Sequence, residues 1–284
     1  MTAKLKPLIE LVKAIGRRHF ITKYAYFAWV FPFEAIELVV DLLLWFFFVQ
    51  ALGGAPSFEE RYEVNPVHFL LTGIVISRFL NYNVSNVYVI VRMLYHSGYS
   101  TFQRLSLGDY LNLYDIKLHY WLIGHMIWDY LRMALIASLY LLIGSLGFGL
   151  RLSVSLETVT AALAIFALGL IATLGIGLIS ASIYLLVGVY RSAEPVQWSV
   201  RLLSKVISGT YFPVDALPRA LQYASLALPH THTLSCLRSV LMLGKGADPN
   251  SLLLLALQAA LFPLAGVPLF KLGLRKHFER GTLI

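Results

Sequence analysis

One stretch of the sequence constrains the fold more than any other, because no Asp, Glu, Lys or Arg occurs between Glu157 and Arg191. The stretch is longer than the roughly 20 apolar residues that a helix needs to cross the hydrocarbon core of a bilayer. In that core every backbone N–H and C=O must be paired within the chain, and a helix pairs them all. The sequence therefore predicts a membrane-spanning helix here.

Five further apolar segments are long enough to be counted as spans. Hydrophobic residues make up 58% of the 284 residues and charged residues only 13%, which is about half the share of charged residues in soluble domains. We therefore predict an all-α membrane protein with six transmembrane helices in a single domain, 1–284. The spans are expected at roughly 33–52, 66–92, 118–147, 157–189, 196–213 and 250–271.

The positions of Lys and Arg predict the orientation of these spans, because cytoplasmic loops carry an excess of both residues. With both termini on one side, that side holds 16 of the 23 Lys and Arg residues. We therefore expect a multi-pass protein of the cell (plasma) membrane with cytoplasmic N- and C-termini, and outward-facing loops at 53–65 and 148–156. The net charge of +8 then reflects topology, so we expect no nucleic-acid partner.

The segment 1–31 has the pattern of an amphipathic helix that lies in the plane of the inner membrane surface. Its basic side chains lie opposite an apolar face, which would be buried at the headgroup boundary. The apolar face is formed by Leu8, Leu11, Val12, Ile15 and Phe20. A cytoplasmic tail with residual helicity is the alternative.

The segment 209–238 is too apolar for a free loop and too often interrupted for a straight helix. Pro213, Pro218 and Pro229 each remove a backbone donor and restrict φ. Non-helical backbone at membrane depth must be covered by protein or line a water-filled cavity. We expect a broken, re-entrant outer segment immediately before the last helix.

The sequence lacks the common motifs of nucleotide binding and hydrolysis. It contains no G-x-x-x-x-G-K-[ST], no H-E-x-x-H and no G-x-S-x-G. His230 and His232 form the one close histidine pair, but two imidazoles do not make a structural zinc site, and we expect both near the outer membrane surface. Cys236 is the single cysteine and excludes an intrachain disulfide. We therefore expect no catalytic residue, metal or cofactor on this chain.

The loop between the second and third spans predicts a short amphipathic helix at 97–116. Gly98 can end the preceding span, and Ser100 or Thr101 can cap the new helix. Phe102 and Leu105 would give this helix an apolar side. Such a helix at the cytoplasmic face suits a docking element, and an ordinary short connector is the alternative.

The layout of the whole chain resembles the permease subunits of ABC-2 type transporters, the type-2 ABC exporters. The most specific part is an ordered pattern before the last span. It consists of a small-residue turn (Ser208-Gly209), aromatic-Pro (Phe212-Pro213), Leu-Pro (Leu217-Pro218), a short helix, Pro229 and a terminal Arg238. The loop at 97–116 is similar to the coupling helix of that family. It departs from the family pattern after Gly98, and it has Leu107-Gly108 where a proline is usual.

The resemblance implies a transport function for the chain. Two copies would pair as a homodimer among membrane lipids and bind two copies of a separate nucleotide-binding ATPase subunit, which carries the ATP and Mg. The pair would move a drug, lipid or lipid-linked glycan from the cytoplasm or inner leaflet outward. The ATPase-coupling residues would be Gly98, Thr101, Phe102, Arg104, Leu105 and Asp109. The outer gate would be formed by Phe212, Pro213, Leu217, Pro218 and Pro229.

Several charged and polar residues lie inside the predicted spans, where an unpaired charge is costly and often functional. They are Glu37, Asp41, Arg78, Asn81, Asp129 and Arg132. Either Asp129–Arg132 and Asp41–Arg78 are structural ion pairs, or these residues line a path for a substrate headgroup. Carboxylates such as Asp41 also allow an alternative function, an ion-coupled secondary transporter.

The span at 157–189 is also rich in small residues, including Gly169, Gly175 and Gly177. Small residues let helix backbones approach closely in a membrane. We expect this span to pack tightly within the bundle.

Overall fold

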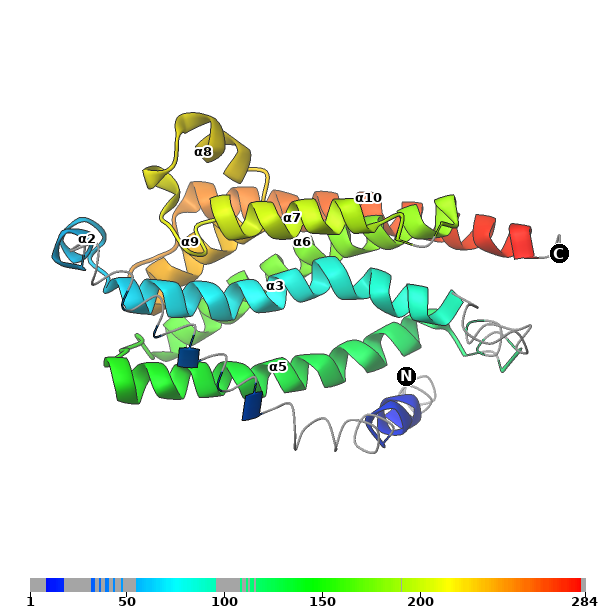
Figure 1. Cartoon of the computed structure of the whole chain (residues 1–284), viewed down its shortest axis with the longest axis horizontal. Helices are drawn as coiled ribbons and strands as arrows, with labels where there is room; N and C mark the ends of the chain where they lie inside the picture. Colours follow the sequence, from blue (N-terminus) through cyan, green and yellow to red (C-terminus); the bar gives the residue numbers. More distant parts are fainter. Residues whose placement is uncertain are drawn as a thin grey trace. The chain divides into compact units, whose positions relative to one another are not determined.

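The computed structural model describes residues 9–17, 55–95, 116–189 and 191–281, with scattered positions between 32 and 47 and between 108 and 114. Every regular element in the described residues is a helix (Figure 1). The chain divides into two compact units. One unit contains Met1–Asp41 and Val89–Leu139, and the other contains Leu42–Tyr88 and Tyr140–Ile284.

Four of the described helices are long and apolar enough to cross a membrane. They are α3 (Pro66–Tyr95), α5 (Leu118–Phe148), α6 (Leu156–Val187) and α10 (Pro249–Gly281). At about 1.5 Å per residue each is about 45 Å long or more, which exceeds the roughly 30 Å of a hydrocarbon core. These helices correspond to four of the six predicted spans, and they indicate a membrane-embedded, all-helical protein.

The other two predicted spans have different outcomes. The span at 33–52 lies mostly outside the described residues. The span at 196–213 corresponds to α7 (Glu194–Ile207), which has only 14 residues and is therefore about 21 Å long. It ends six residues earlier than predicted, because Gly209 takes a left-handed conformation with φ of 85° and turns the chain. The number of spans remains a prediction.

Helix α6 has defined signals at both ends. Ser155 caps its N-terminus in a capping box, in which the Ser155 side chain accepts from the Thr158 N–H while the Thr158 side chain accepts from the Ser155 N–H. Gly188, with φ of 75°, closes the C-terminus. These caps pair the N–H groups of Ser155, Thr158 and Gly188 at the helix ends.

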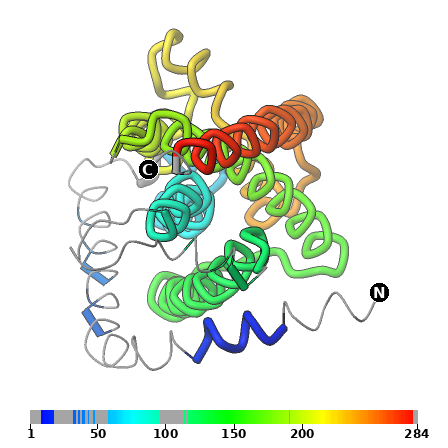
Figure 2. Tube along the Cα trace, turned by 90° about the vertical axis from the view of Figure 1, so that its right-hand side faces the viewer, coloured from blue at the N-terminus to red at the C-terminus, as the bar shows by residue number. Residues whose placement is uncertain are grey.

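Helices α6 and α10 lie side by side (Figures 1 and 2). A Cβ added at Gly175 would lie 2.5 Å from the backbone at Phe262 and Pro263, and one added at Gly266 would lie 2.7 Å from the Gly175 carbonyl. The two backbones therefore touch through their glycines, as the small residues of this span predict.

Between α7 and α10 the chain folds into three short helices, η1 (Val214–Ala216), α8 (Arg219–Ser225) and α9 (Pro229–Leu241). Pro213 and Pro218 stand immediately before η1 and α8, and Pro229 is the first residue of α9. Each proline therefore stands at or immediately before the first residue of a helix, where its missing N–H breaks no helical hydrogen bond. A further helix, α2 (Ala55–Tyr62), lies in the segment predicted as the loop 53–65.

In the other unit, residues 9–17 are helical and pack on α5 (Figure 2). Trp128 Nε1 donates a hydrogen bond of 2.8 Å to the Val12 carbonyl. Ile15 is buried, and a Cβ at Gly124 would lie 2.6 Å from its side chain. The apolar face predicted for 1–31 is thus covered by α5 at Ile15, while its placement at a membrane surface remains a prediction.

Candidate functional site

The residues Ser208, Gly209 and Thr210 form a buried turn at the end of α7, named here the polar turn. Ser208 and Thr210 are almost completely buried, which is unusual for a turn that must pair its own polar groups. Their hydroxyl oxygens lie 2.9 Å apart, and Ser208 Oγ donates to the Ser204 carbonyl. The hydroxyl groups of the polar turn therefore bond to each other and to α7, in addition to the contacts that other helices make.

Helix α3 binds the polar turn from a second side. The hydroxyl oxygens of Ser77 and Thr210 lie 2.7 Å apart, and Ser204 Oγ donates to Asn81 Oδ1 at 3.0 Å. The contact needs Gly73, because a Cβ there would lie 2.5 Å from Arg238 Nη2 and closer still to the Thr210 carbonyl oxygen. Asn81, predicted as a residue of a substrate path, is therefore engaged with α7.

Arg238 on α9 binds the polar turn from a third side. Its Nη1 donates to the Gly209 carbonyl at 2.6 Å, and its Nη2 donates to the carbonyls of Phe69 at 2.7 Å and Thr210 at 3.3 Å. A longer contact of 3.4 Å joins Nε to Thr72 Oγ1. The guanidinium also lies 3.4 Å from the centroid of the Phe69 ring, in the geometry of a cation–π interaction.

The environment of Arg238 is uncommon for a charged group. The side chain is only 9% exposed, and each acceptor above is neutral. Burial lowers the pKa of the guanidinium to about 9, which leaves it protonated at neutral pH. A buried charge without an opposite charge is costly, so Arg238 is the group around which this site is organised.

A cavity of about 350 Å³ lies beside Arg238 and the polar turn. Its walls come from the end of α2 and the start of α3 with their connection, from Ser208 and Gly209 of the polar turn, from η1, and from α9 with the residues that follow it. The lining residues are Tyr62, Val64, Phe69, Ser208, Gly209, Pro213, Val214, Asp215, Thr231, Leu234, Ser235, Arg238, Ser239 and Leu243.

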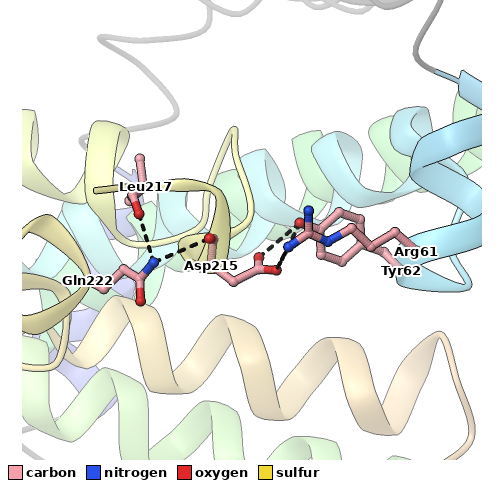
Figure 3. Close-up of polar contacts among 5 residues, drawn as sticks. All are labelled: Arg61, Tyr62, Asp215, Leu217 and Gln222. Carbon is pink, nitrogen blue, oxygen red and sulfur yellow. Dashed lines mark hydrogen bonds and ion pairs between the residues drawn. The ribbon is translucent and has the colours of Figure 1, made fainter. Parts of the chain in front are cut away.

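Asp215 on η1 lies at the edge of this cavity and bonds to two residues of α2 (Figure 3). Its carboxylate accepts from Arg61 Nη2 at 2.9 Å and from the Tyr62 hydroxyl at 3.0 Å. Burial and the hydrogen bond to Asp215 raise the pKa of Tyr62. Gln222 Nε2 donates to the backbone carbonyls of Asp215 at 3.2 Å and Leu217 at 2.7 Å.

A second ion pair lies nearby, between Lys245 and Glu63 at 2.5 Å. Both ion pairs are well exposed, so each stabilises the fold by at most about 1 kcal/mol. Their effect is to hold α2 against η1 and the α9–α10 connection, next to the cavity.

The five predicted gate residues occupy different positions in this segment. Pro213 lines the cavity, and Leu217 receives the hydrogen bond from Gln222 described above. Phe212 is 44% exposed. Pro218 precedes α8, and the buried Pro229 begins α9. The structure thus brings only one of the five to the cavity wall, and a gating role remains a prediction.

The predicted intramembrane charges are only partly described. Arg78 lies on α3 one turn before Asn81 and is half-buried, and no hydrogen bond or ion pair joins it to another described residue. Asp129 and Arg132 are half-buried on α5, one turn apart. Glu37 and Asp41 lie outside the described residues, so the two proposed ion pairs remain predictions.

The proposed ATPase-coupling residues also lie outside the described residues. They are Gly98, Thr101, Phe102, Arg104, Leu105 and Asp109. Helix α3 ends at Tyr95, three residues before Gly98.

His230 and His232 are both buried within α9, and their expected position near the outer membrane surface remains a prediction. His232 Nε2 lies 3.0 Å from the Leu226 carbonyl, while neither ring nitrogen of His230 has a hydrogen-bond partner in the described part of the chain. Burial lowers the pKa of His230 to about 3, so its imidazole is neutral. No group of three or more potential metal ligands occurs among the described residues.

The residues that organise the site were only partly visible in the sequence. Arg238 was recognised as the end of the proline pattern, but nothing in the sequence connects it to the α3 carbonyls. Gly73 and the α2 residues that bind Asp215 were missed. A lone glycine in an apolar helix is a usable signal for a close approach, whereas the contacts of Asp215 depend on residues about 150 positions away.

Neither a protein-family model nor a curated protein matches the chain. The resemblance to ABC-2 permeases therefore rests on the residues of the sequence alone.

Proposed function

We propose that the chain is the membrane-spanning permease subunit of an ATP-driven exporter whose ATPase is a separate subunit. The observation that carries this proposal is the segment between α7 and α10. Its prolines, which carry the resemblance to ABC-2 permeases, each stand at or immediately before the start of a short helix. Arg238, at the end of the segment, binds the polar turn at its start. Four long apolar helices add the membrane-embedded body that a permease needs.

In this proposal two chains pair in the membrane and two ATPase subunits bind their cytoplasmic loops at 97–116. ATP binding closes the ATPase subunits, and the loops move with them. The polar turn is bonded to α3, α7 and α9 at once, so a shift of any of these helices would change the walls of the outer segment. The outer segment would then open for a drug, lipid or lipid-linked glycan that arrives from the cytoplasm or the inner leaflet.

An ion-coupled secondary transporter makes different use of the same helices. It needs a carboxylate that binds a proton or sodium within the membrane, and Asp41 was the candidate. Asp41 lies outside the described residues, so the secondary transporter enters as an outcome of the test.

The test is reconstitution with and without an ATPase. The tagged chain would be purified from its own host in lipid nanodiscs, together with any P-loop ATPase encoded beside it. We expect a stable complex that hydrolyses ATP. Arg104→Glu should weaken ATPase binding at least about tenfold by reversing a charge in the loop. Arg151→Glu, in the exposed turn before α6, is the matched control and should leave it unchanged.

Two results would refute the proposal. One is a chain that binds no P-loop ATPase while its purified form drives uptake or efflux from an ion gradient alone. The other is an ATPase complex that responds equally to Arg104→Glu and Arg151→Glu, since the binding would then not involve the loop.

A further inference from the structure

The cavity beside Arg238 has the size of a site for one small molecule. Its volume of about 350 Å³ lies at the lower end of the roughly 300–1,000 Å³ that is common for ligand pockets. A two-chain lipid would not fit within it, whereas a single ring system or one short chain would.

The walls of the cavity are mostly apolar. Val64 lies between α2 and α3, Phe69 on α3 and Val214 on η1. Leu234 and Leu243 approach the cavity from α9 and the residues that follow it. Apolar walls with a few polar groups are typical of pockets that bind the hydrophobic body of a ligand and orient it by one end.

The polar end of the cavity is cationic. A guanidinium has five N–H donors, and the contacts to Thr72, Gly209, Phe69 and Thr210 account for four of them. Within the described part of the chain, one N–H of Nη1 has no acceptor. Because each acceptor already present is neutral, a ligand with one negative charge would supply both the missing acceptor and the missing counter-charge.

Asp215 is the other charged residue that lines the cavity, and its charge is already balanced. The carboxylate pairs with Arg61 and accepts from Tyr62, as described above. With Asp215 compensated, Arg238 leaves the cavity with a net positive charge, which favours an anion over a cation.

From this arrangement we infer that the cavity binds a small amphipathic anion, an organic monocarboxylate whose apolar body fills the space while its carboxylate meets Arg238. The site is independent of ATP-driven transport and would exist in any protein with this outer segment. The ligand has two potential sources, a single-chain fatty acid from the membrane or a soluble aromatic acid.

Ser235 makes the inference testable without disturbing the buried network. It lies one helical turn before Arg238, lines the cavity, and is itself exposed. Ser235→Asp places a negative charge beside the proposed carboxylate position, and Ser235→Asn is its neutral counterpart of equal size. Ser235→Trp fills the cavity. Thermal unfolding of each variant verifies the fold.

The experiment measures binding of 2-naphthoate and of its neutral analogue 2-naphthylmethanol to the full chain in nanodiscs, by equilibrium dialysis against empty nanodiscs. We expect saturable binding of the acid and at least about tenfold weaker binding of the alcohol. Ser235→Asp should weaken acid binding about tenfold through charge repulsion. Ser235→Asn should change it less than twofold, and Ser235→Trp should abolish it.

Native mass spectrometry of the purified chain distinguishes the two sources. A co-purifying fatty acid that is absent from Ser235→Trp supports the inference and identifies the membrane as the source. Its absence from the wild type, with naphthoate binding as expected, supports a soluble acid. Equal binding of acid and alcohol, an unchanged affinity in Ser235→Asp, or no saturable binding overturns the inference and leaves Arg238 with a structural role only.

Discussion

Gly73→Ala is the substitution that tests the packing of the polar turn most directly. The new methyl group would lie 2.5 Å from Arg238 Nη2 and nearer still to the Thr210 carbonyl oxygen. A carbon needs about 3.5 Å from a non-bonded heavy atom, so α3 and the polar turn must separate by about 1 Å.

That separation has a calculable effect on Arg238. Its hydrogen bond to the Phe69 carbonyl on α3 is now 2.7 Å, and about 1 Å of added length takes it outside hydrogen-bond range. Overpacking strain costs about 1–3 kcal/mol, and a lost hydrogen bond to a charged group costs about 1.5–3 kcal/mol. The higher helix propensity of alanine returns about 0.5–1 kcal/mol. We expect the outer segment to lose about 3 kcal/mol of local stability.

Cys236 on α9 provides the assay. It is completely buried, and burial, with a smaller contribution from Asp248, raises its thiol pKa to about 11. It should therefore react with maleimide only when α9 opens. Since about 1.4 kcal/mol corresponds to a factor of ten, Gly73→Ala should label about 100-fold faster than wild type in nanodiscs. Its thermal unfolding midpoint should fall as well.

Gly147→Ala is the matched control, because a Cβ at this helical glycine meets nothing within 4 Å. It should leave Cys236 labelling unchanged and keep or slightly raise the unfolding midpoint. Equal labelling rates in Gly73→Ala and Gly147→Ala would show that α3 does not hold the polar turn closed.

Three further predictions concern stability measured by thermal unfolding. His230→Phe should stabilise the protein by about 1 kcal/mol, because it removes two buried ring nitrogens without partners. Burial lowers the pKa of His230 from 6.5 to about 3, so between these pH values the unfolded state binds a proton that the folded state does not. The wild type should therefore lose stability as the pH falls below 6.5, and His230→Phe should lose less. Ser155→Ala removes the α6 cap and should lower the free energy of unfolding by about 1 kcal/mol. Gly177→Ala drives a methyl group into the Asn83 carbonyl oxygen and should lower the midpoint by several degrees, unlike Gly147→Ala; an unchanged midpoint would contradict the close contact of α3 and α6.

The presence of a helix and its approximate bounds could be predicted from the sequence wherever they depend only on the residues of that segment. The uncharged stretch that begins after Glu157 became α6, within two residues of the predicted bounds at each end, because a long apolar run can pair its backbone only as a helix. The prediction at 196–213 was less accurate. The aromatic residues Tyr211 and Phe212 extended the predicted span, but Gly209 adopts a positive φ and ends the helical geometry before them.

The site was less predictable than the helices, because its contacts join distant parts of the chain. Arg61 and Asp215 are 154 residues apart, and a single sequence contains no record of which pairs meet. His230 and His232 illustrate the same limit. Nothing in the sequence around Pro229 indicates that these histidines are buried, and the packing of α9 against α6 and α10 buries both.

The sequence by itself therefore determined that this is an apolar helical chain with a proline-broken segment before its last helix. These are consequences of local composition, backbone pairing and the missing N–H of proline. Tertiary structure alone decided that Arg238 reaches back to the polar turn and to α3, and that a cavity opens beside it. Those features depend on close approach at Gly73 and on a buried charge satisfied by distant carbonyls, which exist only once the helices have packed.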